Sequence, residues 1–599
     1  MKREPARSAS PSRVERAPAR VTRIDLALAM GPILLALTLM AAGVSKRGTE
    51  LMPWPDGLEY AAAAVNINSG RGSVLHFGGY SYPARYPQGY SLILAAAYPL
   101  IGRAPENLYR VTIAIGLAAV GLLYLLSLRV FADRWAALAA STLLAVAPVF
   151  ITDSTLVLSD VPALALAIAA ALAIASATES EERARRWTCA GYWLVCAFVA
   201  GFEVTIRQTN LALAIAGIAC LLLVHNESSA ASRHASSRWT FAASLIAFAM
   251  MPAWQALRNW RDLGSPLGSG YVFWVPEVYG FLNRTFNARF LFGPTMPRNP
   301  IGNAAIYGSA LLGFDGLVLA AMGDRSAPLY SLYPAAGAVF AAIGIVCVLQ
   351  GNLRKSGKRV VCFGLLFFGI LFVIYLLYFF TDTVFLLPAS FVLFLLAGLG
   401  IARANRAAFA ARGARTSKDL SKLGVVGVTI LDLVLAVSIV GEVANRCASA
   451  RSVSEPVPAL RRLAAHIEPQ AVVISNVSLQ FLELYLDGAD TRFVGLHSFE
   501  SDSDFSDYHL ARLYAKAASG WGGELPLVMF RDRTRQQSAF DLVADQIKRS
   551  RPAYLLIFPP QSAQYDQTLR HELDQLSVDF AVDEQERAGR FVLFRLQAR

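Results

Sequence analysis

The chain has 599 residues, of which 55% are hydrophobic and only 16% are charged, and its mean hydropathy is +0.43. Soluble proteins carry about a quarter charged residues, so this composition excludes an ordinary soluble enzyme. The formal net charge of +12 does not indicate a nucleic-acid-binding protein, because the basic residues are dispersed among apolar segments instead of following one face.

Residues 1–23 are basic and rich in Pro, Ala and Ser, which predicts a disordered cytoplasmic tail. A signal peptide is disfavoured, because the basic region is long and the apolar run that follows it is long enough to span a membrane. Further apolar runs near twenty residues long recur over residues 24–442. That length crosses a bilayer as a helix, so the sequence predicts a polytopic α-helical membrane protein with about 11 transmembrane helices.

The expected spans are 24–44, 110–131, 135–152, 158–177, 188–205, 209–224, 240–257, 334–350, 360–380, 384–402 and 423–442. Two further segments, 91–102 and 301–322, are apolar and fit interfacial helices that lie along the membrane.

The distribution of Lys and Arg predicts the orientation. With eleven spans and a cytoplasmic N-terminus, five successive short basic loops fall inside, as the positive-inside rule requires. The loops at 153–157 and 381–383 contain neither residue type and fall outside, whereas Lys46 and Arg47 depart from the rule. We therefore expect a multi-pass plasma (inner) membrane protein with extracytoplasmic loops at 45–109 and 258–333. The basic loops carry Arg129 and Arg134; Arg183, Arg185 and Arg186; Arg233 and Arg238; Arg354, Lys355, Lys358 and Arg359; and Arg403, Arg406, Arg412, Arg415, Lys418 and Lys422.

Residues 443–599 differ in composition from the rest of the chain. Short β-like runs alternate with polar, helix-like segments, which predicts a small soluble α/β domain outside the membrane. The runs are 471–475, 492–496, 525–530, 553–558 and 590–594. No CxxC or Cys/His spacing occurs in the chain, so neither a disulfide framework nor a zinc site is indicated.

The first loop contains an acidic segment, Trp54-Pro55-Asp56-Gly57-Leu58-Glu59-Tyr60. A carboxylate at the mouth of a membrane protein has to be hydrated, paired or functional. On a helix, Asp56 and Glu59 lie one turn apart on one face, where two acids can divide the roles of base and partner. The alternative is a pair of acids that only stabilises a helix N-terminus.

Asp160 is a second candidate acid, at the outer start of a span and on the same side as Asp56. It follows Ser159 and precedes Pro162. Either Ser159 or Asp160 could serve only as a helix N-cap.

Four arginines on the outer side are candidates for binding a phosphate, because a guanidinium fork matches phosphate oxygens. Arg85 lies in the first loop beside Tyr86 and Tyr90, which are candidate substrate-binding residues. Arg207 lies in a tight turn, where it binds an anionic ligand, pairs with a carboxylate or reaches the interface. Arg258 and Arg261 leave a span, and anchoring at lipid headgroups is the alternative for both.

The order of these motifs resembles that of the GT-C membrane glycosyltransferases. The motifs are the acidic first loop, Tyr86-Pro87-Gln88-Gly89-Tyr90, Ser159-Asp160, Arg207-Gln208-Thr209-Asn210 and the segment from Arg258 to Pro266. The nearest branch resembles the bacterial relatives of dolichyl-phosphate-mannose protein mannosyltransferases and of lipid A aminoarabinose transferases. The resemblance covers roughly residues 25–442, on the order of the motifs.

The resemblance implies an enzyme that uses a polyprenyl-phosphate-linked sugar and a glycan, lipid or protein acceptor outside the cytoplasm. Asp56 would be the general base on the acceptor hydroxyl, with Asp160 as the acid of the second loop. A positioned carboxylate removes the hydroxyl proton as C1 is attacked, and direct displacement would invert the anomeric centre. Arginines or a divalent cation would stabilise the charge on the leaving phosphate.

The chain departs from the family pattern at Asp382-Thr383-Val384-Phe385-Leu386-Leu387-Pro388. Many relatives have an Arg before the Leu-Leu-Pro of this segment, and here none is present. The phosphate-contacting role is therefore open, and Asp382 is a candidate for binding the acceptor or a cation.

Two other functions fit a protein of this class. A lipid-linked sugar flippase or other transporter would have charged residues at mid-span positions and internal symmetry. A non-catalytic scaffold or receptor would give Asp56 and Asp160 no reason to converge. The acids cluster at span ends on one side, which favours chemistry at the membrane surface.

Overall fold

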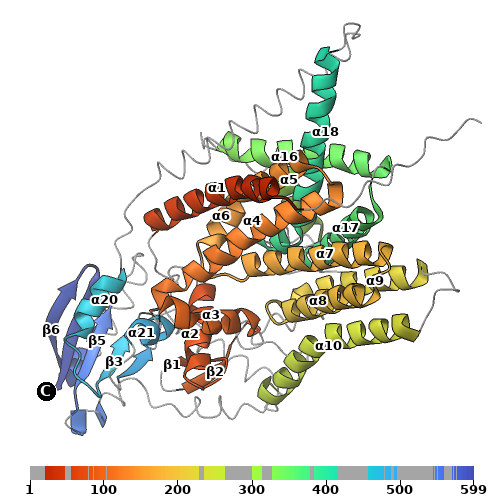
Figure 1. The fold of residues 1–599 in the computed structure, drawn as a ribbon. Helices are drawn as coiled ribbons and strands as arrows, with labels where there is room; N and C mark the ends of the chain where they lie inside the picture. Colours follow the sequence, from red (N-terminus) through yellow and green to blue (C-terminus); the bar gives the residue numbers. More distant parts are fainter. Residues whose placement is uncertain are drawn as a thin grey trace, which may run out of the picture.

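The computed structural model describes most of the helical region and parts of the C-terminal region (Figure 1). The described residues are 21–47, 55–77, 80–84, 86–102, 104–227, 235–263, 300–312, 327–351, 353–377, 383–413, 456–475, 477, 479–486, 491–495, 544–545, 547–549, 551–558, 570, 573–574 and 576–599.

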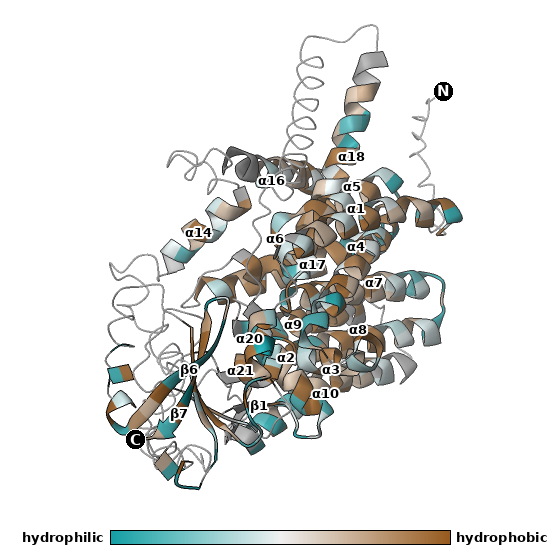
Figure 2. Cartoon of the chain, turned by 90° about the vertical axis from the view of Figure 1, so that its left-hand side faces the viewer, coloured by the Kyte–Doolittle hydropathy of each residue, from teal (hydrophilic) through white to brown (hydrophobic). Residues whose placement is uncertain are grey.

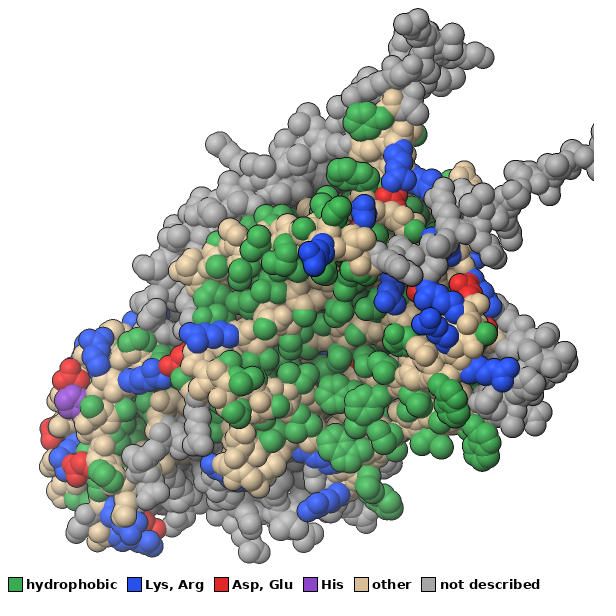
Figure 3. Space-filling model, viewed as in Figure 1, with side chains coloured by type: hydrophobic (Ala, Val, Ile, Leu, Met, Phe, Trp, Pro, Cys, Tyr) green, Lys and Arg blue, Asp and Glu red, His purple; other side chains and the backbone are tan. Residues whose placement is uncertain are grey.

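A bundle of apolar helices makes up the main body. Seven of the described helices are long and apolar enough to cross a membrane, or up to 8 if one bent pair is counted as a single span. Apolar side chains cover the face of the bundle shown in Figure 3, as expected for a surface in contact with lipid. The helices of the bundle are α1 (Arg23–Arg47), α4 (Tyr109–Phe131), α5 (Arg134–Val146), α6 (Pro148–Ser154), α7 (Asp160–Glu182), α8 (Arg186–Val204), α9 (Leu211–Glu227), α10 (Ala235–Leu263), α16 (Ala327–Leu349), α17 (Lys355–Leu376) and α18 (Phe391–Gly413).

The expected polytopic helical fold is confirmed, but the count of 11 spans is not. The apolar stretches Gln208–Val224 and Tyr333–Leu349 are shorter than the other spans. The expected span at 423–442 lies outside the described residues.

Two expected spans are interrupted at prolines. The span at 135–152 bends by 62° between α5 and α6, because Ala147 takes an extended conformation before Pro148, as residues preceding proline do. The span at 384–402 divides into the 3₁₀ helix η4 (Thr383–Ala389), which contains Pro388, and α18. Proline lacks a backbone N–H, so it does not continue an α-helical hydrogen-bond ladder.

Helix α7 lies at the centre of the bundle, and 83% of its most apolar window is buried. Its many alanines let α4, α8 and α17 approach it closely. Helices α16 and α18 cross at two glycines. A Cβ atom at Gly344 would clash with the carbonyl oxygen of Leu396, and one at Gly400 would clash with that of Phe340. Backbone contact therefore holds these two helices together.

A second layer of short elements covers one end of the bundle. It contains α2 (Pro55–Asn68), the antiparallel hairpin of β1 (Val74–Phe77) and β2 (Tyr80–Pro83), α3 (Gly89–Ile101) and the 3₁₀ helix η1 (Pro105–Asn107). Helix α14 (Pro300–Leu312) packs separately, against α16 and α17. Helix α3 coincides with the expected interfacial segment 91–102. Helix α14 covers the first part of the other, 301–322, and residues 313–322 lie outside the described residues.

The C-terminal region contains the expected small sheet. The strand order is β4-β3-β5-β7-β6; β3 is parallel to β4 and β5, and β7 is antiparallel to β5 and β6. Four of the five β-like runs are strands, and the fifth, 525–530, lies outside the described residues. The elements are α20 (Pro456–Ala464), β3 (Val472–Ser475), α21 (Leu479–Leu486), β4 (Arg492–Gly495), β5 (Ala553–Ile557), β6 (Phe580–Ala588) and β7 (Phe591–Ala598).

Strand β6 was not expected. Five consecutive residues at its centre are exposed, and they are mostly hydrophilic (Figure 2). The strand lies at the edge of the sheet, where charged residues prevent pairing with other chains. Its sequence therefore lacks the apolar alternation that marks a strand.

The sheet domain and the first loop share one hydrophobic core. Leu58 and Tyr60 of α2 and Tyr90 of α3 belong to the same buried cluster as Leu460 of α20 and Phe481 of α21. Figure 1 shows α21 beside α2, with α20 packed on α21 and the sheet. An ion pair of 2.5 Å between Arg461 and Glu106 adds a polar contact to this interface. The first loop is therefore held between the bundle and the sheet domain.

We expect the Gly400→Ala variant to be less stable than the wild type by about 1–3 kcal/mol, because the added methyl group meets backbone in the crossing of α16 and α18. Thermal unfolding of the purified protein in detergent measures this change. The control is Gly369→Ala in α17, where a Cβ atom would meet nothing within 4 Å. Equal melting temperatures for the two variants would contradict the packing argument.

Candidate functional site

Helix α2 positions the first pair of acids at the end of the bundle. It begins at Pro55 and has Asp56 in its first turn, an arrangement that suits a helix N-terminus. Asp56 is partly exposed, whereas Glu59, one turn along, is 1% exposed. Only Asp56 is therefore open enough to meet a substrate directly.

Tyr60 joins α2 to the rest of the site. Its ring stacks on Tyr86 with the centroids 4.8 Å apart and meets the edge of Tyr90 at 5.0 Å. Its hydroxyl donates a hydrogen bond of 3.0 Å to Oγ of Ser159, at the start of α7. Ser159 makes no side-chain cap of α7. The segments that carry Asp56 and Asp160 are therefore tied together.

Asp160 forms an ion pair with Arg207, and both groups are largely buried. The residue Asp160 is 5% exposed, and the side chain of Arg207 is 17% exposed. The guanidinium also lies over the ring of Phe385, 5.0 Å from its centroid. Of the roles open to Arg207, pairing with a carboxylate is the one present in this structure.

Phe385 belongs to a group of side chains that fixes this ion pair. Its ring stacks on Tyr375 with the centroids 4.9 Å apart. The Tyr375 hydroxyl lies 2.8 Å from Oγ1 of Thr209, two residues beyond Arg207. Helix α17, η4 and the turn after α8 therefore meet around the guanidinium.

A second arginine holds the beginning of α3. Arg258 of α10 donates hydrogen bonds to Oε1 of Gln88 and, at 2.9 Å, to the carbonyl oxygen of Ser73. The next residue, Gly89, donates its backbone N–H to the carbonyl oxygen of Thr205 at 2.6 Å. A Cβ atom at Gly89 would clash with Thr205, so this close approach requires glycine.

The remaining candidates are placed differently. Arg261 is exposed in the last turn of α10, three residues after Arg258. Tyr86 is partly buried against Tyr60. Arg85 and Asp382 lie outside the described residues. Within the described ranges, no group of three His, Cys, Asp or Glu residues could hold a metal ion.

Tyr90 is fully buried, and its hydroxyl lies 2.6 Å from Oγ1 of Thr112. Burial raises the pKa of this hydroxyl above its ordinary value, and the hydrogen bond with Thr112 opposes the shift only in part. The structure gives Tyr90 packing contacts and no open surface.

Sequence reasoning missed Tyr60, Phe385 and Glu203. Glu203 lies in the last turn of α8, is 0% exposed, and neither carboxylate oxygen has a hydrogen-bond partner in the part of the chain that the structure describes. An acid in an otherwise apolar span was the available signal for Glu203. Tyr60 could have been found from its place one turn after Asp56.

Comparisons with known proteins agree with this architecture. Residues 86–254 match the sequence model of the dolichyl-phosphate-mannose-protein mannosyltransferase family. Two structures of ArnT from Cupriavidus metallidurans, one apo and one bound to undecaprenyl phosphate, superpose with a TM-score of 0.56. They are 12% and 15% identical, and the matches cover 96% and 94% of this chain and 98% and 97% of ArnT.

The chain has the GT-C fold. The arabinofuranosyltransferase AftD from Mycobacteria is also similar, with a TM-score of 0.50 and 13% identity over 97% of this chain and 40% of AftD. No curated protein matches the sequence significantly.

The family match covers only part of the candidate site. It includes Tyr86, Tyr90, Asp160 and Arg207, and it ends before Arg258. Asp56 also lies outside the match. The contacts from Tyr60 to Ser159 and from Arg258 to Gln88 join the unmatched segments to the matched one.

We expect the Arg207→Ala variant to lose about 3 kcal/mol of stability, because it leaves the Asp160 carboxylate buried without its partner. Thermal unfolding measures the loss, and Asp160→Asn in the same chain should restore part of it. The control is Arg261→Ala, which removes an exposed arginine. A loss no larger than that of the control would contradict the buried ion pair.

Proposed function

We propose that this chain is a membrane glycosyltransferase. It transfers a sugar, a hexose or a pentose, from a polyprenyl-phosphate-linked donor to an acceptor hydroxyl. Three findings support the proposal: the GT-C fold, the match of residues 86–254 to the mannosyltransferase family, and the binding of undecaprenyl phosphate by ArnT, which has a similar fold.

The observation that carries the proposal is the hydrogen bond between Tyr60 and Ser159. It unites the acid-bearing helix of the first loop with the acid-bearing start of α7. The acids lie at helix ends and not at mid-span positions, and this favours a transferase over the flippase that was the alternative. A scaffold would not require the two acidic segments to meet.

In the proposed reaction Asp56 is the general base. It accepts the proton of the acceptor hydroxyl as the oxygen attacks C1 of the sugar. The bond between C1 and the phosphate oxygen breaks on the opposite face, so the configuration at C1 inverts. The electron pair leaves with the polyprenyl phosphate, and Asp56 holds the proton.

The other candidates are assigned to positioning and charge stabilisation. Glu59, buried behind Asp56, orients the start of α2. The ion pair between Asp160 and Arg207 fixes the start of α7, next to the Ser159 that Tyr60 of α2 contacts. Arg258 contacts the donor phosphate together with Arg85 and Arg261, because guanidinium groups stabilise charge that develops on a leaving phosphate. Tyr86 and Asp382 contact the sugar or the acceptor.

We place this site on the extracytoplasmic side. Asp160 begins α7, and Glu182 ends it about 34 Å away, at a rise of 1.5 Å per residue over its 23 residues. Basic residues gather at that far end, where Arg359 and Lys355 pair with Glu181. The positive-inside rule puts this far end in the cytoplasm and the sheet domain outside.

We expect the Asp56→Asn variant to fold and to transfer sugar about 10²–10⁴-fold more slowly than the wild type, because it lacks the base. Mass spectrometry of lipids co-purified with the variant should show the intact polyprenyl-phosphate sugar, which the wild type turns over. In a deletion strain, the wild type and the control Asp579→Asn, an exposed residue of the sheet domain, should restore the sugar missing from envelope glycans. Full restoration by Asp56→Asn would refute the role of the base.

A further inference from the structure

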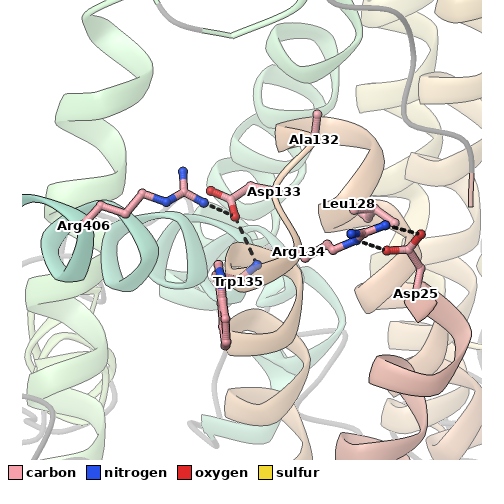
Figure 4. Close-up of a pocket in the computed structure, with 7 residues that line it drawn as sticks. All are labelled: Asp25, Leu128, Ala132, Asp133, Arg134, Trp135 and Arg406. Carbon is pink, nitrogen blue, oxygen red and sulfur yellow. Dashed lines mark hydrogen bonds and ion pairs between the residues drawn. The ribbon is translucent and has the colours of Figure 1, made fainter. Parts of the chain in front are cut away.

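A pocket of about 390 Å³ lies at the opposite end of the bundle from the candidate site (Figure 4). It is formed where the N-terminal end of α1, the turn between α4 and α5, and the C-terminal half of α18 meet. Its volume lies within the range of small-molecule sites. The pocket is lined by Asp25, Leu128, Ala132, Asp133, Arg134, Trp135 and Arg406.

Two arginines of the pocket are held by buried carboxylates. Nε of Arg134 donates to Oδ1 of Asp25 at 2.6 Å, and Nη2 of Arg406 donates to Oδ1 of Asp133 at 2.6 Å. Asp25 is 1% exposed and Asp133 is 7% exposed. Asp133 also caps α5 by accepting the N–H of Trp135 at 3.0 Å. The carboxylates therefore fix the directions of both guanidinium groups from the protein side.

The outer edges of these guanidinium groups remain available. The side chains of Arg134 and Arg406 are 47% and 51% exposed. Among the described residues, Nη1 of Arg134 and both Nη1 and Nε of Arg406 make no hydrogen bond. Each ion pair thus has its carboxylate inside and its unused N–H donors outside. Such charged N–H donors can bind the oxygens of a phosphate group.

The surroundings of the pocket suit the surface of a membrane. Trp135 is 67% exposed beside Arg134, and tryptophan is enriched where headgroups meet acyl chains. Close to Asp25 on α1, Leu26 is 54% exposed and Met30 is 48% exposed, so this part of the helix presents apolar side chains on its surface. A ligand with a phosphate head and an apolar tail fits both features.

We propose that this pocket binds the headgroup of an anionic phospholipid, with its phosphate held between Arg134 and Arg406. A headgroup that carries an ammonium is a poorer ligand, because the carboxylates of Asp25 and Asp133, which would attract it, are buried. The site is independent of the transferase reaction. The proposed site requires guanidinium groups in a fixed geometry. The role of basic residues in membrane topology requires only their positive charge.

The test uses the purified full chain in detergent and native mass spectrometry with phosphatidylglycerol or phosphatidylcholine as the probe. We expect the wild type to retain phosphatidylglycerol in preference to phosphatidylcholine. The double variant Arg134→Lys with Arg406→Lys keeps a positive charge at each position and removes the guanidinium N–H donors. Its affinity for phosphatidylglycerol should fall about tenfold, since charge-assisted hydrogen bonds are lost.

A matched control is Arg461→Lys, which alters a half-exposed arginine of the sheet domain that also pairs with a carboxylate. It should bind phosphatidylglycerol as the wild type does, and unchanged melting temperatures should show that both variants fold. Undiminished phosphatidylglycerol binding by the double variant would overturn the proposal. Equal binding of the two lipids would also overturn it, as would displacement of the lipid by inorganic phosphate at equal concentration.

Discussion

The placement of α2 is the constraint on which the candidate site depends. This helix has only 14 residues, and a helix of that length is marginal in water without tertiary packing. Its position therefore comes from Tyr60, which contacts Tyr86, Tyr90 and Ser159, and from the buried cluster shared with the sheet domain. The acid of the first loop is held by side chains from three regions that are far apart in the sequence.

A second set of contacts connects the first loop to the helices of the bundle. The backbone of Gly89 meets that of Thr205, and Arg258 reaches Gln88 and Ser73 from α10. These bonds lock the first loop to the ends of two bundle helices. Because the hydrogen bond at Gly89 joins backbone atoms and tolerates no side chain, the distance between α3 and α8 is fixed more tightly than side-chain packing alone would fix it.

The sequence predicts the features that depend on local composition. The helices follow from the lengths of the apolar runs, and the GT-C fold from the order of polar motifs at their ends. The partners of those residues depend on the tertiary structure. The pairing of Arg207 with Asp160 brings together positions 47 residues apart, and Phe385 joins them from a later segment. The hydropathy pattern did not predict the charged edge strand β6 or the breaks at Pro148 and Pro388, because each departs from the regular periodicity of a strand or a helix.

The shared core also bears on the role of the sheet domain. Phe481 of α21 and Leu58 of α2 are buried in the same cluster, so a shift of the sheet domain relative to the bundle would expose apolar surface on both sides. Exposed apolar area costs about 25 cal/mol per Å², which opposes such a shift. The domain and the acid-bearing helix therefore move together, if they move at all. An acceptor that bound the sheet domain would consequently be held at a fixed position relative to Asp56, and orientation of this kind is the main advantage that a transferase gains from an accessory domain.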